Sequence, residues 1–168
     1  MTELLNLAHK QIILERNEFL KVADSIDTNI YFIESGSLRV FVINEYEEQT
    51  IRFGYKGNII VSLDSFLSGK PSDLYIQAIK KSEVKVISKA MFDEFLKSEL
   101  NKDWWIKALT SLVLQQMERE MDILTSSPKE RYERVFKRSP QLFQEVPHRY
   151  IANYLRMSPE TLSRLKKS

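Results

Sequence analysis

The first half of the chain places its apolar residues in short runs that turn-forming residues separate. Over residues 11 to about 88 these runs are QIIL, NEFLKV, NIYFIESGSLRVFVI, QTIRFGYKGNII, LYIQAI and EVKVIS. Short runs of this kind are typical of β-strands. All four glycines lie in this part of the chain, and Gly36 stands between YFIES and SLRVF, where a tight hairpin needs a residue that tolerates positive φ. The pattern predicts a β-rich N-terminal domain with a hairpin turn at Gly36.

The apolar period then becomes that of a helix. The stretch KAMFDEFLKSEL carries one apolar face, made of Met91, Phe92, Phe95, Leu96 and Leu100. A longer helix over 101–125 follows, with an apolar stripe made of Ile106, Leu109, Val113, Met117, Met121 and Leu124. The residues that fall away from the stripe are Lys107, Glu118, Arg119 and Asp122. The stripe can pack on the β-rich domain or pair with its copy in a second subunit, and we favour self-pairing because a connector helix has little core of its own.

Residues 126–168 read as a set of short helices. Ser127 can cap a helix and Pro128 suits its first turn, so KERYERVFKR is predicted to be amphipathic, with Tyr132, Val135 and Phe136 inward. The segments HRYIANYL and PETLSRLKK follow as two brief helices, separated from what precedes them by prolines.

These last two helices have the features of a helix-turn-helix. That motif needs a small residue where two short helices cross, with apolar residues around it. The chain supplies them as Ile151, Ala152, Leu155, Met157, Leu162 and Leu165. Ser158 and Pro159 form a strong start signal for the second helix. The pattern therefore predicts that the second helix is seated on the first.

The helical C-terminal region is also basic. Residues 126–168 hold ten Lys and Arg against four Glu, a net charge of +6, while the rest of the chain holds 15 basic and 19 acidic residues, a net charge of −4. This asymmetry indicates an anionic partner for the C-terminal region.

The start of the second helix offers residues that can read DNA. Glu160 and Arg164 are four residues apart and share a helical face. In a major groove an Arg can donate two hydrogen bonds to guanine, and a Glu can accept one from cytosine. The other DNA-binding candidates are Ser158, Thr161, His148, Arg149, Lys166 and Lys167, of which the last four suit phosphates and Thr161 suits a phosphate or a thymine methyl. The alternative is a solvated i,i+4 pair of Glu160 with Arg164. The apolar frame, the capped start of the helix and the net charge of +6 in this region favour the DNA-binding interpretation.

Composition argues against an enzyme. The chain has no cysteine, which excludes disulfides, thiolate-bound zinc and cysteine nucleophiles. Its two histidines, His9 and His148, lie far apart in the sequence, so no two-His metal site is available on the sheet. No GxSxG, P-loop or GxGxxG motif occurs, and a carboxylate pair such as Asp64 and Asp73 is more often solvated than catalytic. We expect no catalytic residue, no metal and no cofactor.

The N-terminus MTELLNLAHKQ lacks the basic and apolar regions of a secretory signal. The most apolar window, WWIKALTSLVL, is too short to span a bilayer. We expect a soluble cytoplasmic protein with no membrane partner.

Four segments together resemble the cyclic AMP receptor and fumarate–nitrate regulator (CRP/FNR) family of bacterial transcription factors. YFIESGSLRVF is similar to the family's early hairpin, GNIIVSLDSFLSGKPSDLYIQA to its phosphate cassette, residues 101–125 to its dimer helix and IANYLRMSPETLSRLKK to its helix-turn-helix. The last match is the most specific, because it places Glu160 and Arg164 on the family's base-reading positions. The resemblance implies a β-roll sensor domain, a coiled-coil dimer and a winged helix-turn-helix that binds two-fold symmetric DNA.

The cassette departs from the family pattern. Members that bind a cyclic nucleotide have a Gly-Glu pair for the ribose and an Arg followed by Ser or Thr for the cyclic phosphate; the matching positions here are Val61 with Ser62, and Ser72 with Asp73. The phosphate would lose its charge partner and meet a repulsive carboxylate, so we expect no control by cyclic AMP. Gly57, Ser62, Ser72 and Asp73 remain candidates for an effector pocket of unknown ligand, although surface-loop roles are the simpler interpretation. Without cysteines, the oxygen-sensing cluster of the other family branch cannot form.

Two further departures concern DNA binding. Arg156 occupies the turn position where many helix-turn-helix proteins have Gly, and a positive φ there would cost about 1 kcal/mol. The given sequence also ends before a wing hairpin could form, and two alternatives are open: DNA affinity is weaker, or a tail that carries the wing follows the given sequence.

We therefore expect an α+β protein with an antiparallel, jelly-roll-like β-roll sensor domain at 1–100, a dimerisation helix at 101–125 and a helix-turn-helix domain without an evident wing at 126–168. The expected function is sequence-specific transcription regulation by a homodimer on an inverted-repeat DNA site. Double-stranded DNA and a second copy of the chain are the expected partners, and RNA polymerase is a further candidate. The alternative is a dimeric ligand sensor or scaffold of the same fold that has lost DNA binding.

Overall fold

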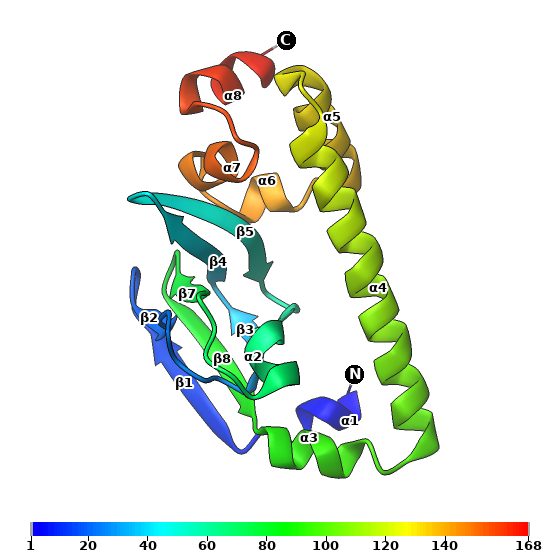
Figure 1. Cartoon of the computed structure of the whole chain (residues 1–168). Coiled ribbons are helices and arrows are strands. Elements are labelled where there is room, and N and C mark those ends of the chain that lie inside the picture. Colours follow the sequence, from blue (N-terminus) through cyan, green and yellow to red (C-terminus); the bar gives the residue numbers. More distant parts are fainter. Residues whose placement is uncertain (1, 168) are drawn as a thin grey trace. The chain divides into compact units, whose positions relative to one another are not determined.

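The structure, a computed structural model, describes residues 2–167 (Figure 1). The chain divides into two compact units, the first ending at Phe95 and the second beginning at Leu96. Each unit is described by itself.

The first unit is built on two four-stranded antiparallel sheets. Their strands are β1 (Lys10–Leu14), β2 (Phe19–Lys21), β3 (Ile30–Ser35), β4 (Ser37–Asn44), β5 (Glu47–Tyr55), β6 (Ile59–Ile60), β7 (Tyr75–Ala78) and β8 (Ser82–Ile87). One sheet has the order β1-β8-β3-β6 and the other β2-β7-β4-β5. Every pairing in them is antiparallel, for example Ile12 opposite Val84 and Leu38 opposite Ala78. The predicted β-roll is confirmed.

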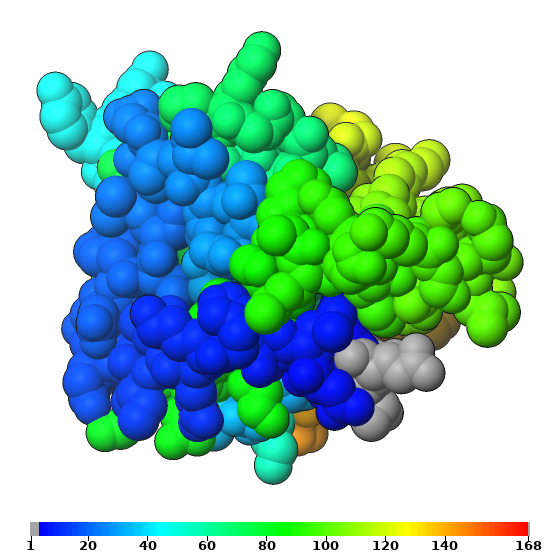
Figure 2. Space-filling model, turned by 90° about the horizontal axis from the view of Figure 1, so that it is seen from below, coloured from blue at the N-terminus to red at the C-terminus, as the bar shows by residue number. Residues whose placement is uncertain are grey.

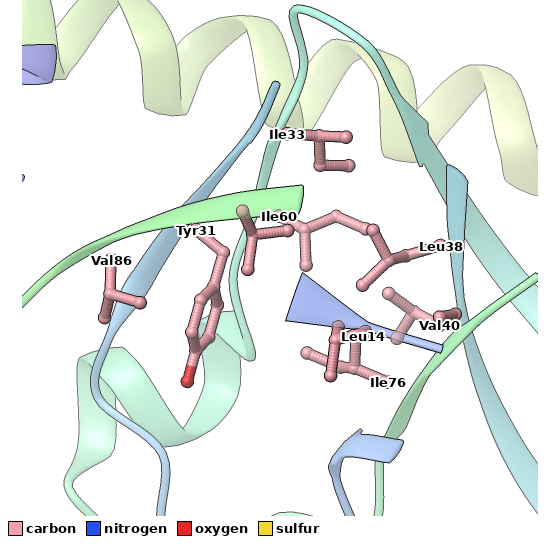
Figure 3. Packing of buried hydrophobic residues seen from close by; sticks show 10 residues of the cluster. Leu14, Tyr31, Ile33, Leu38, Val40, Ile60, Ile76 and Val86 are labelled. Carbon is pink, nitrogen blue, oxygen red and sulfur yellow. The ribbon is translucent and has the colours of Figure 1, made fainter. Parts of the chain in front are cut away.

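The two sheets bury a common apolar core (Figure 3). Alternate residues of the strands point into it, as expected for sheets with one buried face. Its buried members are Leu14, Tyr31, Ile33, Leu38, Val40, Ile60, Ile76, Ala78, Val84 and Val86. Leu38 and Val40 come from β4, while Tyr31 and Ile33 come from β3, so both sheets contribute.

The turn at Gly36 differs from the prediction. Gly36 has a φ of 84°, as expected, but β3 and β4 belong to different sheets, so the residue joins two sheets and makes no hairpin. Close packing explains the glycine, because an added Cβ would lie 2.2 Å from the Ser82 hydroxyl and 2.4 Å from the Lys81 carbonyl oxygen. The adjacent hairpin joins β4 to β5 instead, through Glu45 and Tyr46, which both adopt positive φ without being glycine.

Three short helices complete the first unit: α1 (Thr2–Leu5), α2 (Leu63–Ser68) and α3 (Lys89–Phe95). Figures 1 and 2 show α1 beside α3 at one end of the unit, next to β1. Leu4 of α1 is buried, and Phe92 of α3 packs edge-on against Phe66 of α2 with ring centroids 5.5 Å apart. Leu4, Phe66 and Phe92 thus add buried apolar side chains to the first unit.

The second unit begins with the long helix α4 (Glu99–Leu124). The helix predicted over KAMFDEFLKSEL is thus split, because α3 ends at Phe95 and Leu100 already belongs to α4. Most of the predicted stripe of α4 is exposed, at Ile106, Val113, Met117, Met121 and Leu124. The buried residues of α4 are Arg119 and Asp122, which the pattern had placed on its polar face.

The remaining helices are α5 (Pro128–Arg138), α6 (Leu142–Glu145), α7 (His148–Tyr154) and α8 (Pro159–Leu165). Ser127 caps α5, since its side chain accepts a hydrogen bond from the Glu130 amide, as predicted. Val135 is buried as expected, but Phe136 is 45% exposed and stacks on Tyr132 with ring centroids 5.7 Å apart. The prediction of an inward Phe136 is therefore wrong. The α+β arrangement of β-roll, long helix and C-terminal helices is confirmed.

Candidate functional site

The predicted apolar frame holds α8 on α7. Ala152 is 1% exposed, and Ile151, Leu155 and Leu162 are fully buried. Met157 and Leu165, the other members of the frame, are half-buried. Two short helices joined by a tight turn and packed through a small residue form a helix-turn-helix, as the sequence predicted.

The turn between α7 and α8 contains Arg156 in the left-handed region, with φ of 53°. Its amide donates to the Asn153 carbonyl at 3.1 Å, and the Met157 amide donates to the Ala152 carbonyl at 3.1 Å. Arg156 thus adopts the positive φ whose cost the sequence analysis considered. It carries a strain of about 1 kcal/mol that surrounding contacts must offset.

The start of α8 is fixed by its cap. The Ser158 hydroxyl accepts from the Thr161 amide at 3.1 Å and lies 3.1 Å from the Thr161 hydroxyl, with Pro159 in the first turn. Backbone hydrogen bonding at this end lowers the pKa of Glu160, and the Ser158 side chain and Arg164 lower it further. Glu160 is therefore an ionised acceptor at neutral pH, on a helix end whose dipole favours negative charge.

The candidate base-reading side chains are exposed. Glu160 and Arg164 both face solvent from α8. Among residues 2–167, no ion pair within 4.0 Å joins them, while the charge of Arg164 still contributes to the lowered pKa of Glu160. Both side chains are therefore accessible from outside the chain.

The phosphate-holding candidates lie at the start of α7 and after the end of α8. Lys166 and Lys167 follow it and are exposed. Arg149 is exposed on α7, where it donates to the Tyr150 hydroxyl at 2.7 Å. His148 differs, because burial and then nearby Lys166 lower its pKa. At neutral pH, the imidazole of His148 is therefore uncharged, and its Nε2 atom is buried.

Two arginine side chains that the sequence did not mark as part of the site hold the backbone between α7 and α8. Arg119 of α4 donates to the Tyr154 carbonyl at 2.6 Å, and Arg131 of α5 donates to the Arg156 carbonyl at 3.2 Å. Their only sequence signal is a charged residue within an amphipathic helix, which usually marks a solvent face.

The effector-pocket candidates lie in and near the segment around α2. Ser62 and Ser72 are 0% and 3% exposed, and their hydroxyl oxygens lie 3.2 Å apart; Ser62 also donates to the Asp64 carboxylate at 3.0 Å. Gly57 has a φ of 87° in the turn before β6, and Asp73 is exposed. The surface-loop interpretation is therefore wrong for Ser62 and Ser72, whose hydroxyls are buried and already bound within the chain.

A buried lysine completes this region. Lys21 is 4% exposed, and its ammonium group donates to three carbonyl oxygens, of Val22 at 2.9 Å, Ser72 at 3.0 Å and Leu74 at 2.7 Å. Burial lowers the pKa of Lys21, and the neighbouring carboxylates, led by Asp64, partly restore it. All three donors of the ammonium group are thus used within the chain.

Among residues 2–167, no group of three or more His, Cys, Asp or Glu side chains is arranged to hold a metal ion. In the same part of the chain, no helix combines the length and apolar character needed to cross a membrane.

Comparisons with known proteins agree with this architecture. The chain is similar to FixK2 from Bradyrhizobium japonicum (TM-score 0.75, 18% identity, 94% of this chain and 82% of that chain). It is also similar to the catabolite activator protein of Thermus thermophilus (TM-score 0.61, 17% identity, 99% and 80%) and to CLP, the c-di-GMP-responsive global regulator of Xanthomonas campestris (TM-score 0.67, 14% identity, 97% and 87%). No curated protein sequence matches the chain. A sequence profile described as the cyclic nucleotide-binding domain matches residues 11–99, more than half of the chain. The chain therefore belongs to the cyclic nucleotide-binding domain family, and its fold is that of the CRP/FNR regulators.

Proposed function

We propose that the protein is a sequence-specific, DNA-binding transcription regulator that acts as a homodimer on an inverted-repeat site and is not controlled by cyclic AMP. One observation carries the proposal: α8 is capped, seated on α7 by a buried apolar frame, and presents an ionised Glu160 and an exposed Arg164 from a basic region. A helix mounted in this way fits the major groove of DNA, whose width admits one helix. Regulator folds among the similar structures support the same role.

The residues of the site divide into two roles. Arg164 can donate two hydrogen bonds to guanine, and Glu160 can accept one from cytosine N4. Lys166, Lys167 and Arg149 would neutralise phosphates, a role that fixes the register of a protein on DNA without selecting its sequence.

The exposed stripe of α4 supports a homodimer. The large apolar side chains of this stripe are 54–77% exposed: Ile106, Val113, Met117, Met121 and Leu124. Pairing with a second α4 would remove the stripe from water, and a two-fold pair would carry two copies of α8. Two such helices read half-sites about 34 Å apart, which is one turn of DNA. RNA polymerase is a further candidate partner of a regulator bound in this way.

The buried polar groups support independence from cyclic AMP. A cyclic phosphate needs a charged donor, but Ser72 stands at the position of the family's arginine, and its hydroxyl is bonded to Ser62. The ammonium group of Lys21 donates its hydrogen bonds to three carbonyl oxygens within the chain, so none is left for a phosphate. The exposed carboxylate of Asp73 would repel an anion. Cyclic AMP or cyclic GMP should therefore leave the melting temperature of the chain unchanged in a thermal-shift measurement, and a large stabilisation by either would overturn this part of the proposal.

The assignment of roles is tested by two substitutions of equal charge change. Arg164→Ala should weaken binding to the preferred duplex by about 1–3 kcal/mol and relax base choice at one position of each half-site. Lys167→Ala should weaken binding to all duplexes alike and lower the slope of log affinity against log salt by about one. Equal losses on every sequence from both substitutions would contradict the proposal. A homodimer that binds no duplex would favour the sensor or scaffold alternative.

A further inference from the structure

The turn of the helix-turn-helix is held by two buried guanidinium groups. Arg119, 5% exposed, donates to the carbonyl of Tyr154, the last residue of α7, at 2.6 Å. The same guanidinium carbon lies 3.6 Å from the centre of the Tyr154 ring, as in a cation–π contact. Arg131, 9% exposed, donates to the carbonyl of Arg156 at 3.2 Å.

The same arginines reach back to the junction of α4 with α5. Arg131 also donates to the carbonyl of Thr125, the residue that ends α4, at 2.8 Å. One planar side chain therefore ties the end of α4 to the turn before α8. Arg119 starts from α4 itself and Arg131 from α5, so the carbonyls of Tyr154 at the end of α7 and of Arg156 two residues further on are both held by arginines of these helices.

A second layer fastens α4 to α5. The carboxylate of Asp122, fully buried in α4, accepts from Arg134 Nε at 3.1 Å and from both terminal nitrogens of Arg138. Charge-assisted hydrogen bonds of this kind are stronger and more directional than neutral ones. The two layers use different acceptors: α5 is bonded to α4 through the carboxylate of Asp122 and to the turn through the carbonyl of Arg156.

This arrangement accounts for the strained backbone at Arg156. A non-glycine residue stays in the left-handed region only where its surroundings determine it. Here the carbonyl of the strained residue is itself the acceptor for Arg131. A charged donor that is already buried gains most from keeping this bond, because losing it leaves a desolvated charge without compensation.

We propose that Arg119 and Arg131 are positioning residues that lock α8 to α4, so that the long helix and the reading helix move as one body. This inference rests on the proposed function for its consequence: once two copies of α4 pair, the separation and direction of the two α8 helices are fixed. The dimer then accepts one half-site spacing and rejects its neighbours. Neither arginine touches DNA in this scheme.

Half-site spacing gives the first test. Adding or removing one base pair between the half-sites shifts one of them by about 3.4 Å and about a tenth of a turn. The wild-type chain should lose about tenfold or more in affinity for such duplexes. The double variant Arg119→Met, Arg131→Met should bind all three spacings with affinities within about threefold of one another. Retention of the wild-type spacing preference by the double variant would overturn the inference.

A matched control separates positioning from stability. Leu142 is 6% exposed in α6, so Leu142→Ala costs stability through a cavity but removes no bond to the turn. It should leave the spacing preference at its wild-type value, measured well below the melting temperature of each variant. If Leu142→Ala relaxed the preference as much as the double variant, the arginines would have only a general structural role.

A measurement without DNA separates this inference from the proposed function. Because the chain has no cysteine, spin labels can be attached only where cysteines are introduced, at Gln116→Cys on α4 and Ser163→Cys on α8. Mixing labelled chain with excess unlabelled chain leaves only distances within one subunit. Double electron–electron resonance should give one narrow distance distribution in the wild type and Leu142→Ala backgrounds and a broad one in the double variant. A broad wild-type distribution, or no broadening in the double variant, would overturn the inference, whereas a narrow distribution in a chain that binds no DNA would contradict the proposed function alone.

Discussion

Asp122 and Glu118 are two carboxylates of α4 that bind the same pair of arginines. Comparing them measures how much burial of a carboxylate adds to the free energy of unfolding. Asp122 is 0% exposed and Glu118 is 52% exposed. Arg134 binds Asp122 at 3.1 Å and Glu118 at 3.0 Å, and Arg138 binds both. The hydrogen bonding of Arg138 to Asp122 raises the pKa of Arg138, as expected for a guanidinium held by a carboxylate. The substitutions Asp122→Asn and Glu118→Gln each remove one negative charge from this cluster without changing its size.

The expected losses differ because only one of the carboxylates is desolvated. Breaking a fully buried ion pair costs about 3–5 kcal/mol. Arg134 and Arg138 keep 38% and 30% of their side chains exposed, so water can recover part of their solvation. We therefore expect Asp122→Asn to lower the free energy of unfolding by about 2–3 kcal/mol. Glu118→Gln removes a surface pair and should cost about 0–1 kcal/mol.

Urea denaturation followed by tryptophan fluorescence measures these losses in the second unit. The chain has two tryptophans, Trp104 and Trp105, and both lie in α4. The shift of the unfolding midpoint at constant slope gives the change in free energy. Equal losses for Asp122→Asn and Glu118→Gln would refute the conclusion that burial of the Asp122 carboxylate gives the cluster its strength.

Two further predictions concern the first unit. Gly36→Ala should lower the free energy of unfolding by about 3 kcal/mol or more, because the new Cβ meets Ser82 at a strained φ. Gly57→Ala should cost only about 1 kcal/mol, because Gly57 has a φ of 87° but no atom lies within 4 Å of the added Cβ. Urea denaturation followed by circular dichroism compares the two variants, and similar losses of stability would contradict the packing argument. Burial, and after it the nearby Asp27 carboxylate, raises the pKa of Tyr31. Above about pH 10 the unfolded chain therefore releases a proton that the folded chain keeps. The free energy of unfolding should then fall by about 1.4 kcal/mol per pH unit. The Tyr31→Phe variant should lack this part of the slope, and an unchanged slope would count against it.

The helix-turn-helix could be predicted because its signals are local. Ser158 caps α8 through a bond to a residue three positions away, and Ala152 and Leu155 recur at helical spacing. Capping and amphipathic spacing depend on neighbours in sequence, so a sequence carries them directly. The place of Arg156 in the turn was local information in the same way, and its φ of 53° is what the structure adds.

The supports of the site could not be predicted, because they depend on partners far away in sequence. Arg119 and Asp122 stand on the polar face of α4, and burial of that face is decided by α5 and the turn after α7. Lys21 has no local signal for burial either, since its acceptors Ser72 and Leu74 lie about fifty residues away. Gly36 shows the intermediate case: its φ was predictable, but its position between two sheets was not.

The central claim is that a dimer presents two copies of α8 to the bases of DNA. Selection of duplexes from a random pool by the full chain, at low salt, tests this claim most directly. We expect enrichment of an inverted repeat with half-site centres about 10 base pairs apart, bound at least about a thousandfold more tightly than random duplex. Failure to enrich any sequence, with equal affinity for selected and random duplexes, would contradict it.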